Sequence, residues 1–233
     1  MCSMVLFFSC KDSYTSAIKV EYSGQELFEG IIFGVGPAAK HLPCLTSITK
    51  VEDLLEESDP IYKEFIAIKY LLLQTLEDDN INFFSDFKRG IQSGDHLTIQ
   101  ETLNMASVKY REVIIKISGL NDNELNTTAN SLVKKYDLLD KEGKYSKENL
   151  KNAIRSLNNT ENGKKSADAC LYVAIAAVVI LVLVIAQVAV AYFQWTYAAQ
   201  ANSIVADDEN RVGSKGSLFN DQLINEIAIN LRN

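Results

Sequence analysis

The chain has 233 residues, 23% of which are charged, and a formal net charge of −7 at pH 7. This length accommodates one domain with a sizeable hydrophobic core and an appended segment. The acidic balance argues against nucleic acid as a partner, because binding to nucleic acid needs a basic surface. The charges are also unevenly distributed, since one long internal stretch contains none.

The chain begins with a short apolar run that ends in Ser9 and Cys10 and is followed by Lys11. An apolar run that ends in a small residue and a cysteine resembles the lipobox of bacterial lipoprotein signal peptides. This pattern predicts a signal segment over residues 1–10, with Cys10 as the candidate lipidation site. No positive charge precedes the run, whereas signal peptides usually begin with one. The alternative is that the run forms a buried apolar arm.

Residues 11–157 have mainly helical periodicity, which predicts a helical N-terminal domain in a mainly α fold. Asp59 and Pro60 are typical of a helix N-cap followed by proline in the first turn. Thr98 and Glu101 match a capping box, which predicts that a helix starts at Thr98. We expect helices over residues 24–33, from residue 60, and over residues 80–91, 98–117, 121–138 and 146–157.

Residues 158–168 are polar and interrupt this periodicity, so we interpret them as an exposed linker. Residues 169–206, by contrast, contain no Asp, Glu, Lys or Arg over 38 consecutive positions. As a helix, the most apolar part, residues 169–193, would reach about 37 Å, which exceeds the roughly 30 Å hydrocarbon core of a bilayer. The candidate membrane-active residues are Ala169, Cys170, Leu171, Ile180, Leu183, Gln187, Phe193 and Trp195.

The composition of this hydrophobic segment favours lipid as its environment. Residues 171–193 include 14 Leu, Ile, Val or Phe side chains. These favour insertion by about 4–8 kcal/mol before the cost of Gln187 is subtracted. Aromatic residues such as Trp195 follow at the C-terminal end, where rings prefer the headgroup layer. The alternative is a helix that is buried on all sides in a helical bundle.

Residues 207–233 are predicted to form an acidic loop followed by a short amphipathic helix. The loop is expected over residues 207–217, which contain acidic side chains, glycines and serines. Apolar residues then recur at helical spacing, which predicts one buried face on the last helix. The predicted buried face consists of Leu223, Ile224, Ile227, Ala228 and Leu231.

Patterns of catalytic chemistry are scarce. His41 and His96 are far apart in the chain and have no second ligand at metal-binding spacing, so no metal site is predicted. Residues 34–39 formally fit the G-x-G-x-x-A fingerprint, but a dinucleotide-binding fold needs repeated strand-helix units. We expect these glycines instead to end a helix before Pro37. The sequence therefore predicts no cofactor and no enzymatic activity.

The chain has four cysteines, and their pairing depends on the fate of the N-terminus. If Cys2 leaves with the signal segment and Cys10 is lipidated, Cys44 and Cys170 remain. Two remaining thiols in an exported protein can pair, so a Cys44–Cys170 disulfide is one hypothesis. The alternative is two unrelated buried thiols.

Residues 22–43, YSGQELFEGIIFGVGPAAKHLP, carry a family resemblance. This block resembles the opening signature of the SdpC-type antimicrobial peptides, also called sporulation-delaying or killing-factor toxins. In that signature, an aromatic-x-Gly-x-Glu-x-Phe-x-Gly-aliphatic pattern precedes a Phe-Gly-x-Gly turn. The later segments also follow the family's order, with a helical region, a long apolar segment and a short amphipathic C-terminal helix. The resemblance therefore covers roughly residues 20–233. The matching positions, called the signature residues below, are Tyr22, Gly24, Glu26, Phe28, Gly30, Phe33, Gly34 and Gly36.

The resemblance implies a secreted precursor from which an internal hydrophobic peptide is cut. In that family, the peptide inserts into the membranes of neighbouring cells and collapses the proton-motive force. The resemblance also implies processing proteases and a membrane immunity protein as partners. The best-known toxin of this kind has a pair of cysteines in its released peptide. The segment here has Cys170 alone, so an internal disulfide loop is impossible.

These observations predict an exported precursor, lipidated or membrane-associated, whose hydrophobic segment depolarises target bacterial membranes after proteolytic release. One alternative is a single-span membrane-anchored lipoprotein or interaction protein without toxin activity. In a single-span protein, the basic flank before the segment and the acidic flank after it would place the N-terminal domain in the cytoplasm. That orientation conflicts with an exported Cys10. Another alternative is a fully soluble helical protein with an unusually apolar core helix.

Overall fold

The computed structural model describes residues 21–46, 58, 60–138, 146, 148–149, 151–153, 155–156 and 213–232. These residues are mainly helical and no strand occurs among them, which confirms the mainly α part of the predicted fold class. The predicted signal segment with Cys10, the linker 158–168 and the hydrophobic segment 169–206 lie outside the described residues. None of the helices that are described has both the length and the apolar character needed to cross a bilayer.

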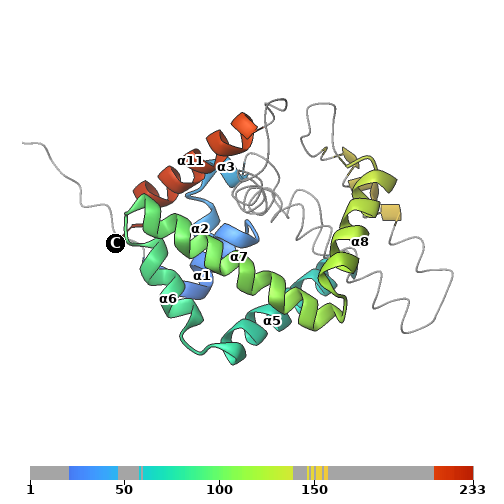
Figure 1. Ribbon diagram of the computed structural model, residues 1–233, viewed down its shortest axis with the longest axis horizontal. Helices are drawn as coiled ribbons and strands as arrows, with labels where there is room; N and C mark the ends of the chain where they lie inside the picture. Colours follow the sequence, from blue (N-terminus) through green and yellow to red (C-terminus); the bar gives the residue numbers. More distant parts are fainter. Residues whose placement is uncertain are drawn as a thin grey trace, which may run out of the picture.

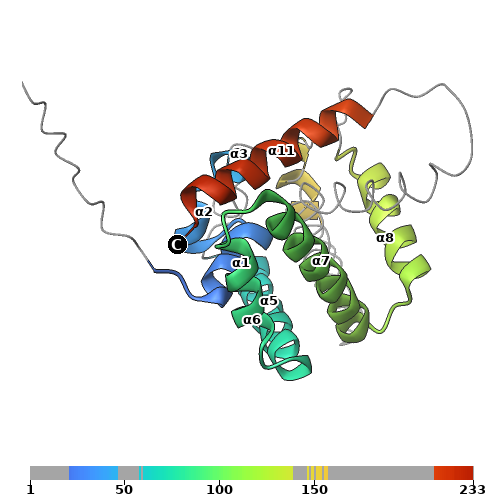
Figure 2. The same ribbon diagram turned by 60° about the vertical axis from the view of Figure 1, so that its left-hand side comes forward.

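Helices α5, α6 and α7 lie side by side, and α11 crosses over α7 at one end of this group (Figures 1 and 2). Helix α1 packs against α2 and α6, and α11 also contacts α3. The bounds of the helices are α1 (Gly24–Ile32), α2 (Gly36–Ala39), α3 (Pro43–Thr46), α5 (Pro60–Asp79), α6 (Phe83–Ile91), α7 (His96–Ser118), α8 (Asp122–Lys135) and α11 (Gly213–Asn230).

Helix α1 begins with a capping box, which fixes its first turn. The Ser23 hydroxyl accepts a hydrogen bond from the Glu26 backbone N–H at 3.1 Å. The Ser23 backbone N–H in turn donates to the Glu26 carboxylate at 2.8 Å. These two bonds satisfy backbone donors that have no partner within the helix. The hydrogen bonds from Ser23, first from its backbone and then from its side chain, lower the pKa of Glu26.

We expect the Glu26→Gln substitution to lower the free energy of unfolding by about 0.3–1 kcal/mol at pH 7. Glutamine can still accept the Ser23 bond, so the variant removes mainly the charge. Because the pKa of Glu26 is lower in the folded protein, its contribution is present above the unfolded pKa of about 4.3 and is lost as the pH falls through the folded value. Urea unfolding at pH 7 and pH 3 measures the effect.

The matched control is Glu101→Gln, which removes a charge from an exposed position on α7. It should leave the unfolding free energy unchanged within about 0.5 kcal/mol. If the Glu26→Gln variant differs from the unsubstituted protein equally at both pH values, the carboxylate does not stabilise α1 as described.

Two predicted helix starts are wrong. Helix α7 begins at His96 rather than near Thr98, because Asp95 is its N-cap. The Asp95 carboxylate accepts hydrogen bonds from both the backbone N–H and the hydroxyl of Thr98, each at 2.8 Å. Helix α6 begins at Phe83 rather than at residue 80, because residues 80–82 form a turn.

The remaining predicted boundaries agree more closely with the structure. Helix α5 begins at Pro60, as expected. Helix α7 ends at Ser118 and is capped by Gly119, whose φ of 68° is left-handed. Helix α8 follows a capping box formed by Asn121 and Glu124. The predicted loop over residues 207–217 is partly wrong, because α11 already begins at Gly213.

Candidate functional site

The aromatic signature residues lie in the hydrophobic core of the domain. Phe28 is fully buried, and its ring contacts four other phenylalanine rings at centroid distances of 5.3–6.0 Å. All four pairs have edge-to-face geometry, which aromatic rings prefer over direct stacking. The rings around Phe28 are those of Phe33, Phe83, Phe84 and Phe87.

Phe33 extends this aromatic cluster toward the long helices. It is fully buried, and its ring lies 6.4 Å from that of Phe65 on α5 and 6.2 Å from that of Tyr110 on α7. Tyr22 is also buried, and its ring lies 5.9 Å from that of His41. The aromatic signature residues therefore join α1 to α5, α6 and α7.

The glycines of the signature allow close helix contacts and a tight turn. A Cβ atom added to Gly24 would lie 1.9 Å from the Phe84 backbone oxygen. A Cβ atom on Gly30 would lie 2.7 Å from the Ala38 Cβ. Any larger residue at these two positions would push α1 away from α6 or α2. Gly34 and Gly36 have φ values of 66° and 82°, and they form the turn after α1 that was predicted before Pro37. Gly36 is also the first residue of α2, which was not predicted.

Helix α11 buries its predicted apolar face in this same core. All five residues of the predicted face are at most 5% exposed, which confirms that prediction. Complete burial of one Leu or Ile side chain is worth about 1.5–3 kcal/mol as an upper estimate. The four Leu and Ile residues of this face therefore contribute on the order of 6–12 kcal/mol, before the entropy of ordering the helix is subtracted. They are Leu223, Ile224, Ile227 and Leu231.

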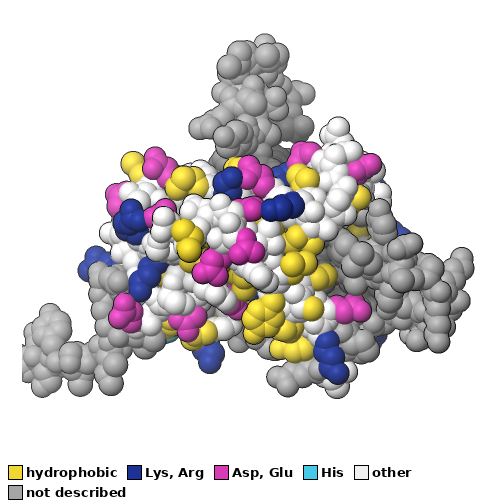
Figure 3. Space-filling model, turned by 90° about the horizontal axis from the view of Figure 1, so that it is seen from below, with side chains coloured by type: hydrophobic (Ala, Val, Ile, Leu, Met, Phe, Trp, Pro, Cys, Tyr) yellow, Lys and Arg dark blue, Asp and Glu magenta, His cyan; other side chains and the backbone are white. Residues whose placement is uncertain are grey.

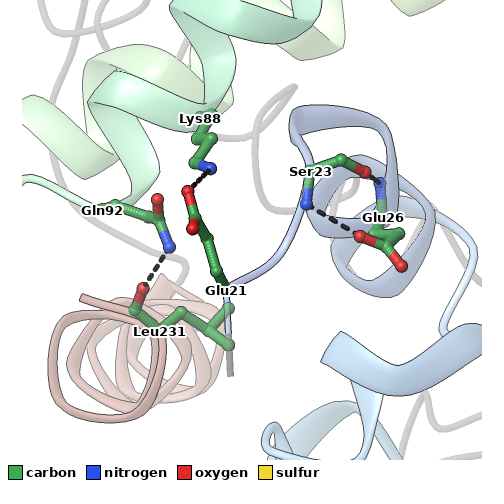
Figure 4. A network of polar contacts seen from close by, with 6 residues as sticks. All are labelled: Glu21, Ser23, Glu26, Lys88, Gln92 and Leu231. Carbon is green, nitrogen blue, oxygen red and sulfur yellow. Dashed lines mark hydrogen bonds and ion pairs between the residues drawn. The ribbon is translucent and has the colours of Figure 1, made fainter. Parts of the chain in front are cut away.

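Three hydrogen bonds fix α11 on the rest of the domain. The Glu226 carboxylate accepts from the Cys44 backbone N–H at 3.0 Å. The Asn230 side-chain amide donates to the His41 carbonyl at 2.8 Å. The buried Gln92 amide donates to the Leu231 carbonyl at 3.1 Å (Figure 4). Each bond joins residues more than 130 positions apart, so α11 is held by residues from much earlier in the chain.

Figure 4 also shows that the residues before α1 lie beside the hydrogen bond between Gln92 and Leu231. Glu21, just before α1, pairs with Lys88 of α6 at 3.1 Å. Residues just before α1, just after α6 and just after α11 thus lie close together. The Glu21 side chain is 80% exposed, so this ion pair adds little stability.

Cys44 lies at the junction between α3 and α11. It is buried, and this burial, together with the neighbouring Glu226 carboxylate, raises the pKa of the Cys44 thiol far above its usual range. Disulfide exchange requires the thiolate, which these surroundings disfavour. Cys170 lies outside the described residues, so the Cys44–Cys170 disulfide stays a prediction.

The other candidate residues lie apart from one another. His41 precedes α3 and contacts α11 through its carbonyl, whereas His96 is the first residue of α7. In the described parts of the chain, no three His, Cys, Asp or Glu side chains group together as metal ligands would. Hydrophobic side chains lie among acidic and basic ones on the face shown in Figure 3. The candidate membrane-active residues all lie outside the described residues.

Three polar residues that hold α11 were not predicted from the sequence, namely Gln92, Glu226 and Asn230. Gln92 follows α6 and is nearly buried, which is unusual for an amide side chain. No sequence signal identified it, because its partner is 139 positions away. Glu226 lies beside the predicted buried face of α11. A charged residue next to a buried face is the one feature of the sequence that could have identified it.

A model of the sporulation delaying protein family toxins matches residues 19–232, which is nearly the whole chain. The chain therefore belongs to this family of toxins, as the signature residues indicated. The matched region includes both the helical domain and α11, so it extends well beyond the signature itself.

One curated relative is similar over part of its length. It is the uncharacterized protein YitM of Bacillus subtilis (strain 168), which is 27% identical over 96 residues. The matched stretch covers 41% of this chain and 46% of that protein, so it spans about half of the relative's length. No solved structure matches the chain.

Proposed function

We propose that this chain is the exported precursor of an antimicrobial toxin and that residues 169–206 are its active part. The released segment enters the membrane of a target bacterium and abolishes the membrane potential. The observation that carries this proposal is the absence of any charged side chain over 38 positions in a member of a toxin family. No catalytic step and no cofactor take part in this mechanism.

The helical domain acts as a carrier in this proposal. An apolar segment rich in Val and Ile self-associates when it is exposed to water. The helical domain is built from residues that precede the segment and from α11, which follows it. This folded domain keeps the precursor from aggregating before processing. Proteases cut in the flanks, near residues 164–165 and 207–216, and a membrane immunity protein protects the producing cell. Lipidation of Cys10 would hold the precursor at the membrane of that cell.

A synthetic peptide of residues 165–206 should depolarise bacterial cells, whereas the intact precursor at the same concentration should not. A voltage-sensitive dye measures the potential, and fluorescence of Trp195 reports partitioning into the membrane. If the peptide partitions but the potential persists, the toxin proposal is wrong. The chain would then be better explained as a single-span anchored protein without toxin activity.

A further inference from the structure

Helix α11 follows the hydrophobic segment in sequence, yet it packs on helices that precede the segment. Its apolar face is buried against α3 and α7, in one core cluster with residues of α1 and α6. The hydrophobic segment therefore lies, in sequence, between two parts of the chain that pack on each other in the described structure.

The contact between α11 and the rest of the domain has the features of a binding interface. Ile227 is fully buried, while its neighbour Ile229 is 65% exposed, so the two faces of α11 are sharply different. Three hydrogen bonds from Gln92, Cys44 and Asn230 fix the register of α11 along the domain. None of these contacts needs a covalent connection through residues 157–212.

We propose that α11 stays bound to the helical domain as a separate chain once the connection through the hydrophobic segment is cut. The helical domain then holds the segment from both ends. A single cut before the segment leaves it attached through α11, and a single cut after it leaves it attached through the linker. Only two cuts free the segment, and they leave behind a two-chain complex of the helical domain and α11. The meaning of this arrangement for release rests on the proposed function, whereas the docking of α11 does not.

The experiment uses the full chain with recognition sites for a specific protease placed in residues 158–165, in residues 207–212, or in both. Each version is cut in a mild detergent and separated by size-exclusion chromatography under native conditions. After the double cut, the C-terminal fragment should elute with the helical domain, and the hydrophobic segment should elute with the micelles. After the single cut before the segment, the segment should remain with the helical domain through α11.

Ile227→Asp places a charge in the buried face and should weaken retention of the C-terminal fragment by about 100-fold or more. The matched control is Ile229→Asp, which introduces the same charge on the exposed face of the same helix and should retain the fragment. Circular dichroism of both uncut variants checks that the domain is folded. If Ile227→Asp prevents folding, the double cut of the unsubstituted protein still decides the question.

The proposal is overturned if the C-terminal fragment of the unsubstituted protein separates from the helical domain after the double cut. It is also overturned if the Ile227→Asp and Ile229→Asp fragments are retained equally by folded domains. Neither readout involves membrane potential or cell killing, so the docking of α11 and the toxin activity can fail independently.

Discussion

Replacing Phe28 with alanine is expected to lower the free energy of unfolding by about 3–5 kcal/mol. The Phe28 side chain is fully buried and contacts four phenylalanine rings, so its loss leaves a cavity at the centre of the domain. A loss of this size is comparable to much of the total stability of a typical domain. Urea unfolding followed by circular dichroism at 222 nm measures the change.

The control for this prediction is Leu97→Ala, which removes a large apolar side chain that is 70% exposed. It should change the unfolding free energy by no more than about 0.5 kcal/mol. Equal losses for the two variants would show that Phe28 does not occupy the core. If the helical domain acts as the proposed carrier, a destabilised Phe28→Ala precursor should also aggregate more readily than the unsubstituted precursor.

Leu183→Arg in the peptide of residues 165–206 is expected to abolish most of its membrane activity. Leu183 lies near the middle of the apolar residues 171–193, where an arginine costs about 2.5–3.5 kcal/mol and the loss of leucine adds about 0.5 kcal/mol. The sum corresponds to a decrease in insertion of roughly 100- to 1,000-fold. Depolarisation of cells as a function of peptide concentration measures this decrease.

Ala206→Arg provides the matched control, because it adds the same charge at the end of the segment rather than at its centre. A charge at this position can remain in water, so activity should change by no more than a few-fold. If both arginine variants lose activity equally, the peptide acts through its net charge at the surface and not by crossing the hydrocarbon core.

The sequence was sufficient to predict which residues of α11 are buried but not what they contact. The spacing of Ile224, Ile227 and Leu231 defines one helical face, and local periodicity alone reveals such a face. The position of α11 over α3 and α7 depends on contacts between residues more than 130 positions apart. Nothing in a single sequence records such pairs, so the joining of the two ends was not predicted.

The errors at helix starts have local causes. Asp95 and Thr98 are both good N-cap residues, and the carboxylate prevails because it accepts two hydrogen bonds from Thr98. At the start of α11, Gly213 and Gly216 have low helix propensity, which favoured a loop. The later turns of α11 are docked in the core, and this packing outweighs the propensity of the first turn.

All signature residues belong to the helical domain, and none belongs to the hydrophobic segment. The residues that stabilise the domain, such as Phe28 and Gly30, are therefore separate from the residues that we propose act on membranes. In the proposed function, a substitution at Phe28 alters the folding of the precursor but leaves the released peptide chemically identical, whereas a substitution at Leu183 alters the peptide itself.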